Sequence, residues 1–237
     1  MSTAPPGPPP PPPPIAPPPA GTPGAIPWEE RQRYGFVPAL VETVKLFVTA
    51  PAEAWRRTPE KGSILDPLLF AILVSWLGAI VRAVYGMFFT VPWLRMMPPA
   101  MRERFGGAMA GHAFGFVAQV ILAPIAITLI LFIWSAILHV CLMMVGGLSA
   151  STSGFDGTFR VSCYSSVADL AQAIPLLGGL VAAIWKIVLV VMGIVALHRT
   201  TQGKAIAAVL IPLVVCCGCA ALLSVLIFGA VFGAMRH

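Results

Sequence analysis

The sequence predicts an all-α membrane protein: a bundle of about five transmembrane helices, preceded by a disordered proline-rich tail and an interfacial amphipathic helix. Of its 237 residues, 58% are hydrophobic and only 10% are charged, whereas a soluble domain carries about a quarter charged residues. Several apolar stretches reach the roughly twenty residues that a helix needs to cross a bilayer. Fourteen of the 24 prolines precede Trp28, so the proline excess belongs to one segment.

Residues 1–27 form the proline-rich head, in which Pro8 to Pro14 is an unbroken run. Proline has no backbone donor, and the segment has no apolar face to bury, so we expect a disordered cytosolic tail with polyproline II character. It lacks the basic start, apolar middle and cleavage site of a signal peptide. Two roles stay open: a ligand for an SH3- or WW-like reader of proline-rich motifs, or a solvated spacer.

Residues 28–65 are predicted to be a cytosolic or interfacial amphipathic segment. Between Val37 and Arg57 the apolar residues follow helical spacing, at Leu40, Val41, Val44, Phe47 and Val48. Pro51 interrupts the pattern before Trp55, and tryptophan beside arginine is typical of a membrane interface. The alternative is a small soluble cap packed on the membrane domain.

Residues 66–233 form the predicted membrane domain, with spans near 67–91, 116–145, 161–177, 180–198 and 205–232. Asp66 and Pro67 are a typical helix start. We expect the connection 92–115, which mixes apolar and basic residues, to lie on the membrane surface. One helix over residues 161–197 would be about 55 Å long, which exceeds the bilayer, so Pro175 and Gly178 indicate a hairpin of two helices.

The distribution of cations predicts the orientation. With five spans and the N-terminus inside, nine Lys and Arg residues outside the spans are cytoplasmic and four lie on the far side, as the positive-inside rule favours. The C-terminus is then on the opposite side. The chain has no Asn, and Arg outnumbers Lys eleven to four, which indicates a GC-rich genome. Because the cations are scattered between apolar blocks, we expect no nucleic-acid partner.

The sequence contains few residues that could carry chemistry. It has no phosphate-binding glycine loop, no HExxH motif and no GxSxG motif, so we predict no enzyme and no cofactor. The cluster Cys216-Cys217-x-Cys219 is either a soft metal site or small apolar packing, and we expect no metal because only Cys216 and Cys219 share a helix face. An intramembrane enzyme would require His139 or His198 beside Cys163 or Ser165.

Ionisable residues inside the predicted spans are functional candidates by default. These are Arg82, Asp169 and Lys186, accompanied by the polar His139 and Gln119. We expect an ion pair between Lys186 and Asp169 across the hairpin, either as a structural pair that fixes helix register or as part of a permeation path. Arg82 either snorkels to the far interface or pairs with Asp169.

Small residues mark places where helix backbones can approach closely, the usual basis of helix association in lipid. They occur as Gly229-x-x-x-Gly233, Gly178-Gly179 and Ala182-Ala183. These faces join helices within the chain, or bind other membrane proteins or a second copy.

A series of short motifs resembles the Yip-one domain family, the Ypt/Rab-GTPase-interacting membrane proteins and their prokaryotic relatives. The motifs are Gly146-Gly147, Phe155-Asp156-Gly157-Thr158-Phe159-Arg160-Val161, Tyr164-Ser165, Ile174-Pro175-Leu176-Leu177-Gly178 and His198-Arg199-Thr200-Thr201-Gln202-Gly203-Lys204-Ala205 with Ile211-Pro212. The resemblance implies five transmembrane helices with a cytosolic N-terminus. For eukaryotic members it implies vesicle budding and fusion through prenylated small GTPases. Here a polyproline head followed by Trp28-Glu29-Glu30-Arg31 replaces the acidic motif of those members, as in a bacterial relative that has no Rab to bind.

We therefore predict a non-enzymatic scaffold or membrane-organising, trafficking-like factor. Its partner-binding surfaces are expected to be a cytosolic loop from Phe155 to Val161, a second loop from Arg199 to Lys204, and the amphipathic segment. The candidate partner-binding residues are Phe155, Asp156, Gly157, Thr158, Phe159, Arg160, Tyr164, Arg199 and Lys204. The alternative function is a small permease or channel whose path uses Arg82, Asp169 and Lys186.

Overall fold

The computed structural model describes residues 24–96, 99–175 and 177–234, apart from the side chains of 83, 86–120, 217, 220 and 226–234. Every regular element in the described part is helical. In chain order they are α1 (Arg31–Tyr34), α2 (Phe36–Thr49), α3 (Pro51–Arg57), α4 (Leu65–Met96), α5 (Pro99–Met144), α6 (Gly154–Tyr164), the 3₁₀ helix η1 (Ser165–Ala173), α7 (Gly178–His198) and α8 (Gln202–Ala234).

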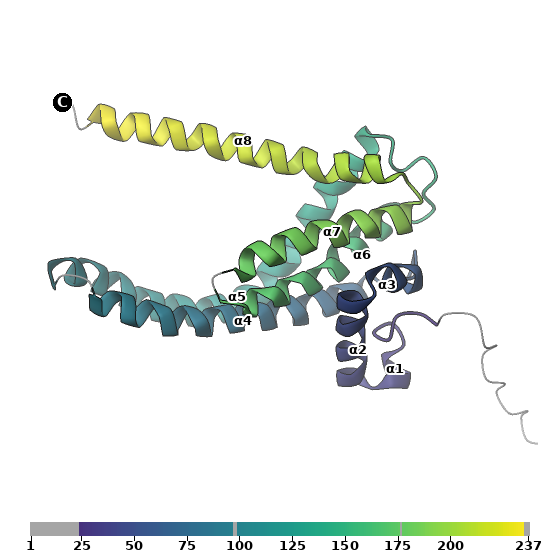
Figure 1. The fold of residues 1–237 in the computed structure, drawn as a ribbon, viewed down its shortest axis with the longest axis horizontal. Helices are drawn as coiled ribbons and strands as arrows, with labels where there is room; N and C mark the ends of the chain where they lie inside the picture. Colours follow the sequence, from purple (N-terminus) through teal and green to yellow (C-terminus); the bar gives the residue numbers. More distant parts are fainter. Residues whose placement is uncertain (1–23, 97–98, 176, 235–237) are drawn as a thin grey trace, which may run out of the picture.

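The first three helices form a small cap at one end of the long helices. Figure 1 shows α2 running across the direction of α4, α7 and α8. The amphipathic pattern is confirmed as helix: α2 buries Ala39, Thr43 and Phe47 on one face. Proline at the first position of α3 separates the two helices where the sequence predicts the interruption.

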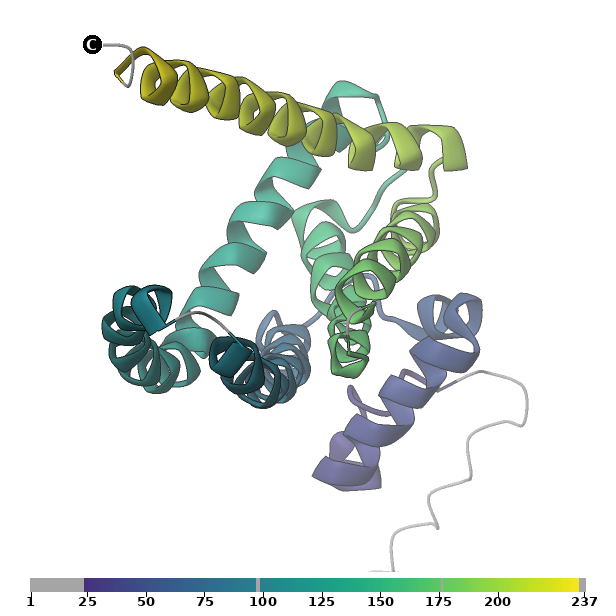
Figure 2. The same ribbon diagram turned by 60° about the vertical axis from the view of Figure 1, so that its left-hand side comes forward.

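Four helices in the described part are long and apolar enough to cross a membrane: α4, α5, α7 and α8. Their qualifying windows are Leu65–Arg82, Ile121–Met144, Gly178–His198 and Gln202–Val225. Figure 2 shows α5 passing obliquely from the side of α4 to the side of α8, and α5 packs against both. The first, second, fourth and fifth predicted spans therefore correspond to apolar helices.

The third predicted span, 161–177, contains no single helix of membrane-spanning length in the structure. The chain there forms α6, which already begins at Gly154, and then η1, neither of which meets the length and hydropathy of a membrane-spanning helix. Polar residues of α6, such as Asp156, Thr158 and Arg160, lower the mean hydropathy of this segment. All residues from Gly157 to Ala168 are buried, so this broken helix is the centre of the bundle and contacts α4, α5 and α7.

Two other boundaries bear on the sequence predictions. The hairpin break is confirmed, because η1 ends at Ala173, α7 begins at Gly178, and the Gly178 amide donates to the Ile174 carbonyl over 3.0 Å. The connection 92–115, expected on the membrane surface, is helical where the structure describes it: α4 continues to Met96 and α5 begins at Pro99. Its apolar residues extend the helical pattern past the expected ends.

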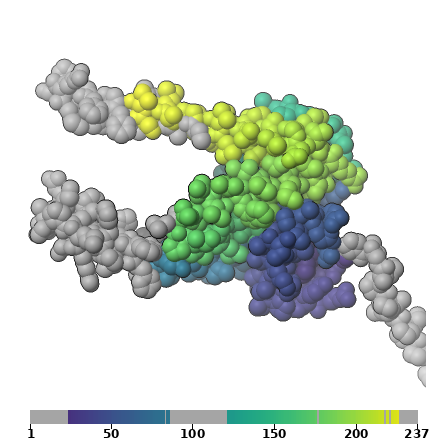
Figure 3. Space-filling view, in the orientation of Figure 1, coloured from purple at the N-terminus to yellow at the C-terminus, as the bar shows by residue number. Residues whose placement is uncertain are grey.

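Some predictions fall outside the described residues. These concern the disorder of the tail over residues 1–23, the surroundings of Gln119 and the contacts of Gly229 and Gly233. The space-filling view shows α7 and α8 above the cap on one face of the molecule (Figure 3).

Candidate functional site

The cap is attached to the bundle by Trp28, whose side chain is fully buried. Its indole N–H donates to the Asp66 carbonyl over 2.7 Å, and its backbone N–H donates to the Thr43 hydroxyl over 2.9 Å. The ring packs against Phe70, with centroids 5.8 Å apart. One residue thus joins the segment before α1 to both α2 and the start of α4.

An aromatic cluster continues this attachment on the central helix. Phe47 of α2 stacks on Tyr164 of α6 at 5.6 Å with an angle of 12°, and Tyr164 also packs on Phe70. Trp55 of α3 lies over Gly193 of α7, where an added Cβ would come within 2.9 Å of the indole ring. Gly193 is therefore needed for the close approach of the cap to α7.

A buried cation lies directly beneath the cap. Arg160 of α6 is 0% exposed and forms an ion pair with Glu29, at 2.7 Å between Nη1 and Oε1. Its Nη2 donates to the Ser63 carbonyl over 2.9 Å, and its Nε lies 3.3 Å from Asp156 Oδ1 without hydrogen-bond geometry. The Tyr164 hydroxyl donates to the same Glu29 oxygen. Glu29 thereby ties the cap to α6.

These contacts correct the predicted partner-binding loop. Residues 155–161 belong to α6 instead of a loop, and Gly157, Thr158, Phe159, Arg160 and Tyr164 are buried. Phe155 and Asp156 are only partly buried, and the Asp156 carboxylate accepts from the Gly62 amide over 3.1 Å. Most of the motif thus lies inside the protein, where Arg160 and Asp156 have partners in Glu29 and Gly62.

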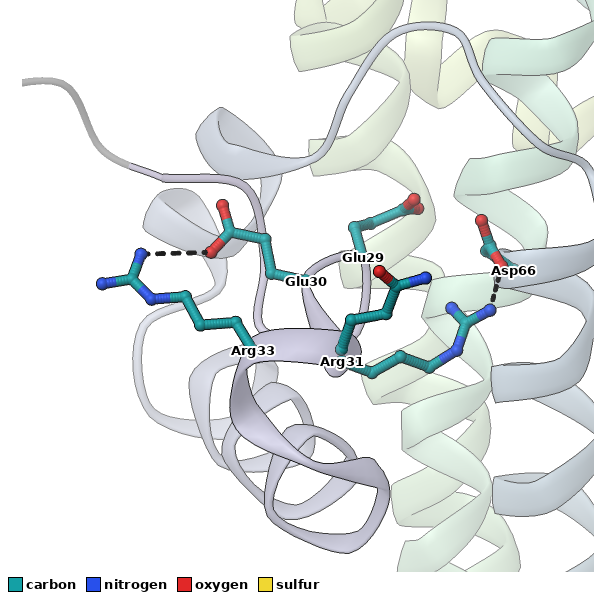
Figure 4. Close-up of a pocket in the computed structure, with 6 residues that line it drawn as sticks. Glu29, Glu30, Arg31, Arg33 and Asp66 are labelled. Atoms are coloured by element: carbon teal, nitrogen blue, oxygen red, sulfur yellow. Dashed lines mark hydrogen bonds and ion pairs between the residues drawn. The ribbon is translucent and has the colours of Figure 1, made fainter. Parts of the chain in front are cut away.

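The outer side of the same region has a shallow polar hollow of about 340 Å³. Figure 4 shows Arg31 directed toward Asp66 and Arg33 directed toward Glu30. The first pair is close, at 2.6 Å, and the second is loose, at 3.9 Å. Both pairs are partly exposed, so the hollow is a solvent-exposed surface beside the buried contact of Glu29 with Arg160.

A second polar contact joins the cap to the loops at its end of the bundle. Glu60 accepts hydrogen bonds from the Thr152 hydroxyl and from Arg199 Nη2, each at 2.6 Å. The hydrogen bond from Thr152, followed by that from Arg199, lowers the pKa of Glu60 below its usual 4.5. Lys204 Nζ donates to the Gly146 carbonyl over 2.9 Å. The structure thus places Arg199 and Lys204 at the surface, in contact with neighbouring loops.

Two histidines meet around Thr158 beneath these loops. The Thr158 hydroxyl is hydrogen-bonded to His139 Nδ1 at 2.8 Å and to His198 Nε2 at 3.0 Å. His198 Nδ1 lies 2.7 Å from the Ser151 hydroxyl. In the described part, neither histidine is hydrogen-bonded to Cys163 or Ser165, the pairing that an intramembrane enzyme would require. The cluster ties α5, α6 and the end of α7 together.

The predicted intramembrane ion pair is present at the other end of the broken helix. Lys186 Nζ of α7 lies 3.0 Å from both carboxylate oxygens of Asp169 in η1. The Ser75 hydroxyl of α4 donates to Asp169 Oδ2 over 2.8 Å. Arg82 is not the partner of Asp169, but both residues line the same hollow.

Two further candidate sites can be placed. Within the described residues, no group of three or more His, Cys, Asp or Glu side chains could hold a metal ion. Cys216 and Cys219 are exposed on α8. The small residue Gly178 faces η1, with an added Cβ at 2.4 Å from the Ala171 carbonyl, whereas Gly179 has nothing within 4 Å.

Sequence reasoning did not identify Glu29, Glu60 or the Thr158 bridge as structural sites. Glu29 is 131 residues before Arg160, and no local spacing links them. The available signal was chemical: the acidic Glu29 stands next to Trp28, and Arg160 stands among apolar residues much later in the chain. That pattern requires a buried counter-charge without specifying its position.

The all-helical architecture and the four apolar helices define an integral membrane protein. The sequence profile of the Yip1 domain matches residues 44–232, which is most of the chain. This protein therefore belongs to the Yip1 domain family. No curated protein and no solved structure matches it.

Proposed function

We propose that this chain is a non-enzymatic scaffold that organises other proteins at a membrane, in the manner of a trafficking factor. Membership of the Yip1 domain family, which is not known for enzymatic activity, supports this role. The few polar clusters described above hold helices and loops together. The function would then reside in the surfaces that the fold presents.

The outer face of α2 is the observation that carries the proposal. Its side chains Val37, Val41 and Val48 are 64, 54 and 53% exposed, and Phe36 beside them is 48% exposed. The opposite face of α2, with Ala39, Thr43 and Phe47, is buried. An apolar stripe on a helix that crosses the bundle direction (Figure 1) suits the interfacial region of a bilayer or an apolar partner lying there.

The topology we propose has five crossings, with α6 and η1 as the third. Eleven α-helical and nine 3₁₀ residues extend about 35 Å, enough to cross the hydrocarbon. A polar helix is tolerated at membrane depth when protein surrounds it. The cap and alternate helix ends are joined by the contacts Gly62–Asp156, Glu60–Arg199 and Lys204–Gly146, which supports a C-terminus on the side opposite the N-terminus. By the positive-inside rule we propose that the cap side is cytoplasmic, in a bacterial inner membrane.

The partners we propose are membrane proteins or a second copy of this chain. Gly179 and Ala183 lie one turn apart on the exposed side of α7, where another helix could approach. Residues 1–27 are proposed to bind a reader of proline-rich motifs, or otherwise to act as a spacer. The lipid bilayer, which surrounds the membrane domain, is itself a partner in this proposal.

The test is partner capture with matched variants of the full chain. Crosslinking in native membranes should give a defined set of partners, which Val37→Gln with Val41→Gln weakens and Val181→Gln, an exposed site on α7, leaves unchanged. Liposomes containing the purified chain should show no solute flux. Partner sets that are identical in all three proteins would contradict the role of the α2 face.

The second candidate, a small permease or channel, is favoured by one observation. Arg82, Asp169 and Lys186 line a common hollow within the membrane domain. If the chain is a permease, Asp169→Asn with Lys186→Met should abolish flux while partner capture stays intact. Flux that depends on this pair would replace the scaffold proposal.

A further inference from the structure

The hollow beside Asp169 has an unusual combination of linings. It has a volume of about 450 Å³, within the range of small-ligand sites. One part is polar, formed by η1, α4 and α7, and the other is an apolar wall from α5. The lining includes Ser75, Arg82, Asp169, Gln172 and Lys186 on the polar part and Leu122, Ala126, Ile127, Ile130 and Leu131 on the wall.

The charges of the polar part do not balance. Asp169 is neutralised by Lys186 at 3.0 Å and accepts from Ser75. Arg82 is exposed and has no ion-pair partner among the residues that the structure describes. The three ionisable groups therefore sum to one positive charge. Because a charge without a partner at the edge of the bilayer core is costly, an anionic group bound in the hollow would be stabilised there.

The apolar wall indicates what carries that anion. Leu122 and Ile130 are 55 and 64% exposed along α5, so the hollow opens on the lipid-facing surface. Arg82 lies seventeen residues beyond Leu65, or about 25 Å along α4, near the far boundary of a hydrocarbon layer about 30 Å thick. A headgroup phosphate of the leaflet opposite the cap is at this depth, with its acyl chain beside the wall.

We propose that the hollow between α4, α5, η1 and α7 is a binding site for one anionic phospholipid, whose phosphate is held by Arg82 and whose chain packs on Leu122, Ala126 and Ile130. The Asp169–Lys186 pair limits the site to one net positive charge, and the Gln172 amide adds neutral hydrogen-bonding capacity. This site is independent of the proposed scaffold function. It gives a reason for the charge of Arg82 on α4, which has no ion-pair partner among the described residues.

The experiment uses the full chain in membranes with spin-labelled lipids. The motionally restricted fraction is measured for spin-labelled phosphatidylglycerol and for phosphatidylcholine. We expect a preference for phosphatidylglycerol that Arg82→Gln lowers about fivefold, the effect of removing one cation near a lipid headgroup. Arg82→Lys should retain most of it. Arg56→Gln, which removes an exposed cation of the cap, should leave it unchanged.

Additional arms separate the lipid from other sources of phosphate and from misfolding. Inorganic phosphate should not displace the labelled lipid, because it cannot use the apolar wall. Ile130→Trp should reduce the restricted fraction by filling the hollow while Arg82 remains, and the thermal unfolding midpoint of each variant is measured. Equal binding of both lipids, displacement by inorganic phosphate, or the same loss in Arg56→Gln as in Arg82→Gln would overturn the proposal.

Discussion

The two ends of the central broken helix hold charge in opposite ways. At the α6 end, Arg160 is fully buried and contacts Glu29, Asp156 and a backbone carbonyl. At the η1 end, Asp169 and Lys186 pair beside an open hollow that also contains an uncompensated Arg82. A buried cation that is paired with a carboxylate and a backbone carbonyl holds elements in place, whereas an incompletely compensated one can bind a ligand. The comparison thus separates a structural fastening, the Arg160–Glu29 contact that holds the cap, from a ligand site, the hollow beside Asp169.

The largest expected effect tests the fastening. Arg160→Met should lower the free energy of unfolding by about 3–5 kcal/mol, because it leaves Glu29 without its counter-charge beneath the cap. Unfolding is measured in mixed micelles titrated with dodecyl sulfate. The matched control is Arg56→Met, since Arg56 contacts Glu53 but is 72% exposed, and surface pairs contribute at most about 1 kcal/mol.

A double variant identifies the origin of that cost. Glu29→Gln combined with Arg160→Met removes both charges, so much of the stability lost in Arg160→Met should return. If the double variant is less stable than Arg160→Met alone, the pair is not the source of the effect. The role of Arg160 would then lie in its contact with the Ser63 carbonyl.

The fastening also shows what sequence can predict. α2 was predicted from apolar spacing and α8 from apolar length, because both properties are local. The burial of residues 157–164 was not predicted, because Asp156, Thr158 and Arg160 have the composition of a loop and their partners are distant in sequence. Conversely, Asp169 and Lys186 were predicted to pair because the hairpin break at Pro175 placed them on facing arms. A site is therefore predictable where local topology brings its members together, and not where one member comes from a separate cap.

The next largest effect tests how closely η1 fits its neighbours. Gly178→Ala should cost about 2 kcal/mol, because its Cβ would lie 2.4 Å from the Ala171 carbonyl and force α7 away from η1. Gly179→Ala is the matched control, as nothing lies within 4 Å of the added Cβ. Both variants are measured by thermal unfolding in detergent. Helix propensity favours alanine over glycine at both positions, so it cannot explain a loss. Equal loss in the two variants would mean that the η1 contact does not set the result.

A smaller effect on stability should distinguish the ligand end from the fastening. Asp169→Asn leaves Lys186 without a counter-charge, but the Lys186 side chain is 35% exposed, so we expect a cost of only about 1–2 kcal/mol. The hollow then carries two positive charges instead of one. The preference for anionic over zwitterionic lipid should therefore increase, measured with the same spin-labelled lipids. A fall in that preference would mean that Asp169 positions the cationic side chains, and that its charge does not oppose binding.

The smallest effect concerns the contact between Glu60 and the loops at the cap end. Hydrogen bonds from Thr152 and Arg199 lower the pKa of Glu60 in the folded protein below its usual 4.5. A carboxyl with a lowered folded pKa contributes stability that is fully present above its unfolded pKa and is lost as pH falls through the folded value.

We therefore expect Glu60→Gln to lower stability at pH 7 by less than about 1 kcal/mol, because the pair is partly exposed. The difference from the unchanged chain should shrink as pH falls below 4.5 and disappear below the folded pKa of Glu60. The measurement is the thermal unfolding midpoint between pH 3 and pH 7. The control is Glu42→Gln, which removes a carboxylate whose exposed pair with Lys45 spans 3.7 Å. A Glu60→Gln deficit that persists at the lowest pH would assign the contribution to side-chain shape instead of charge. The exposed Glu60 contact would then stabilise the fold through packing and not through an ion pair.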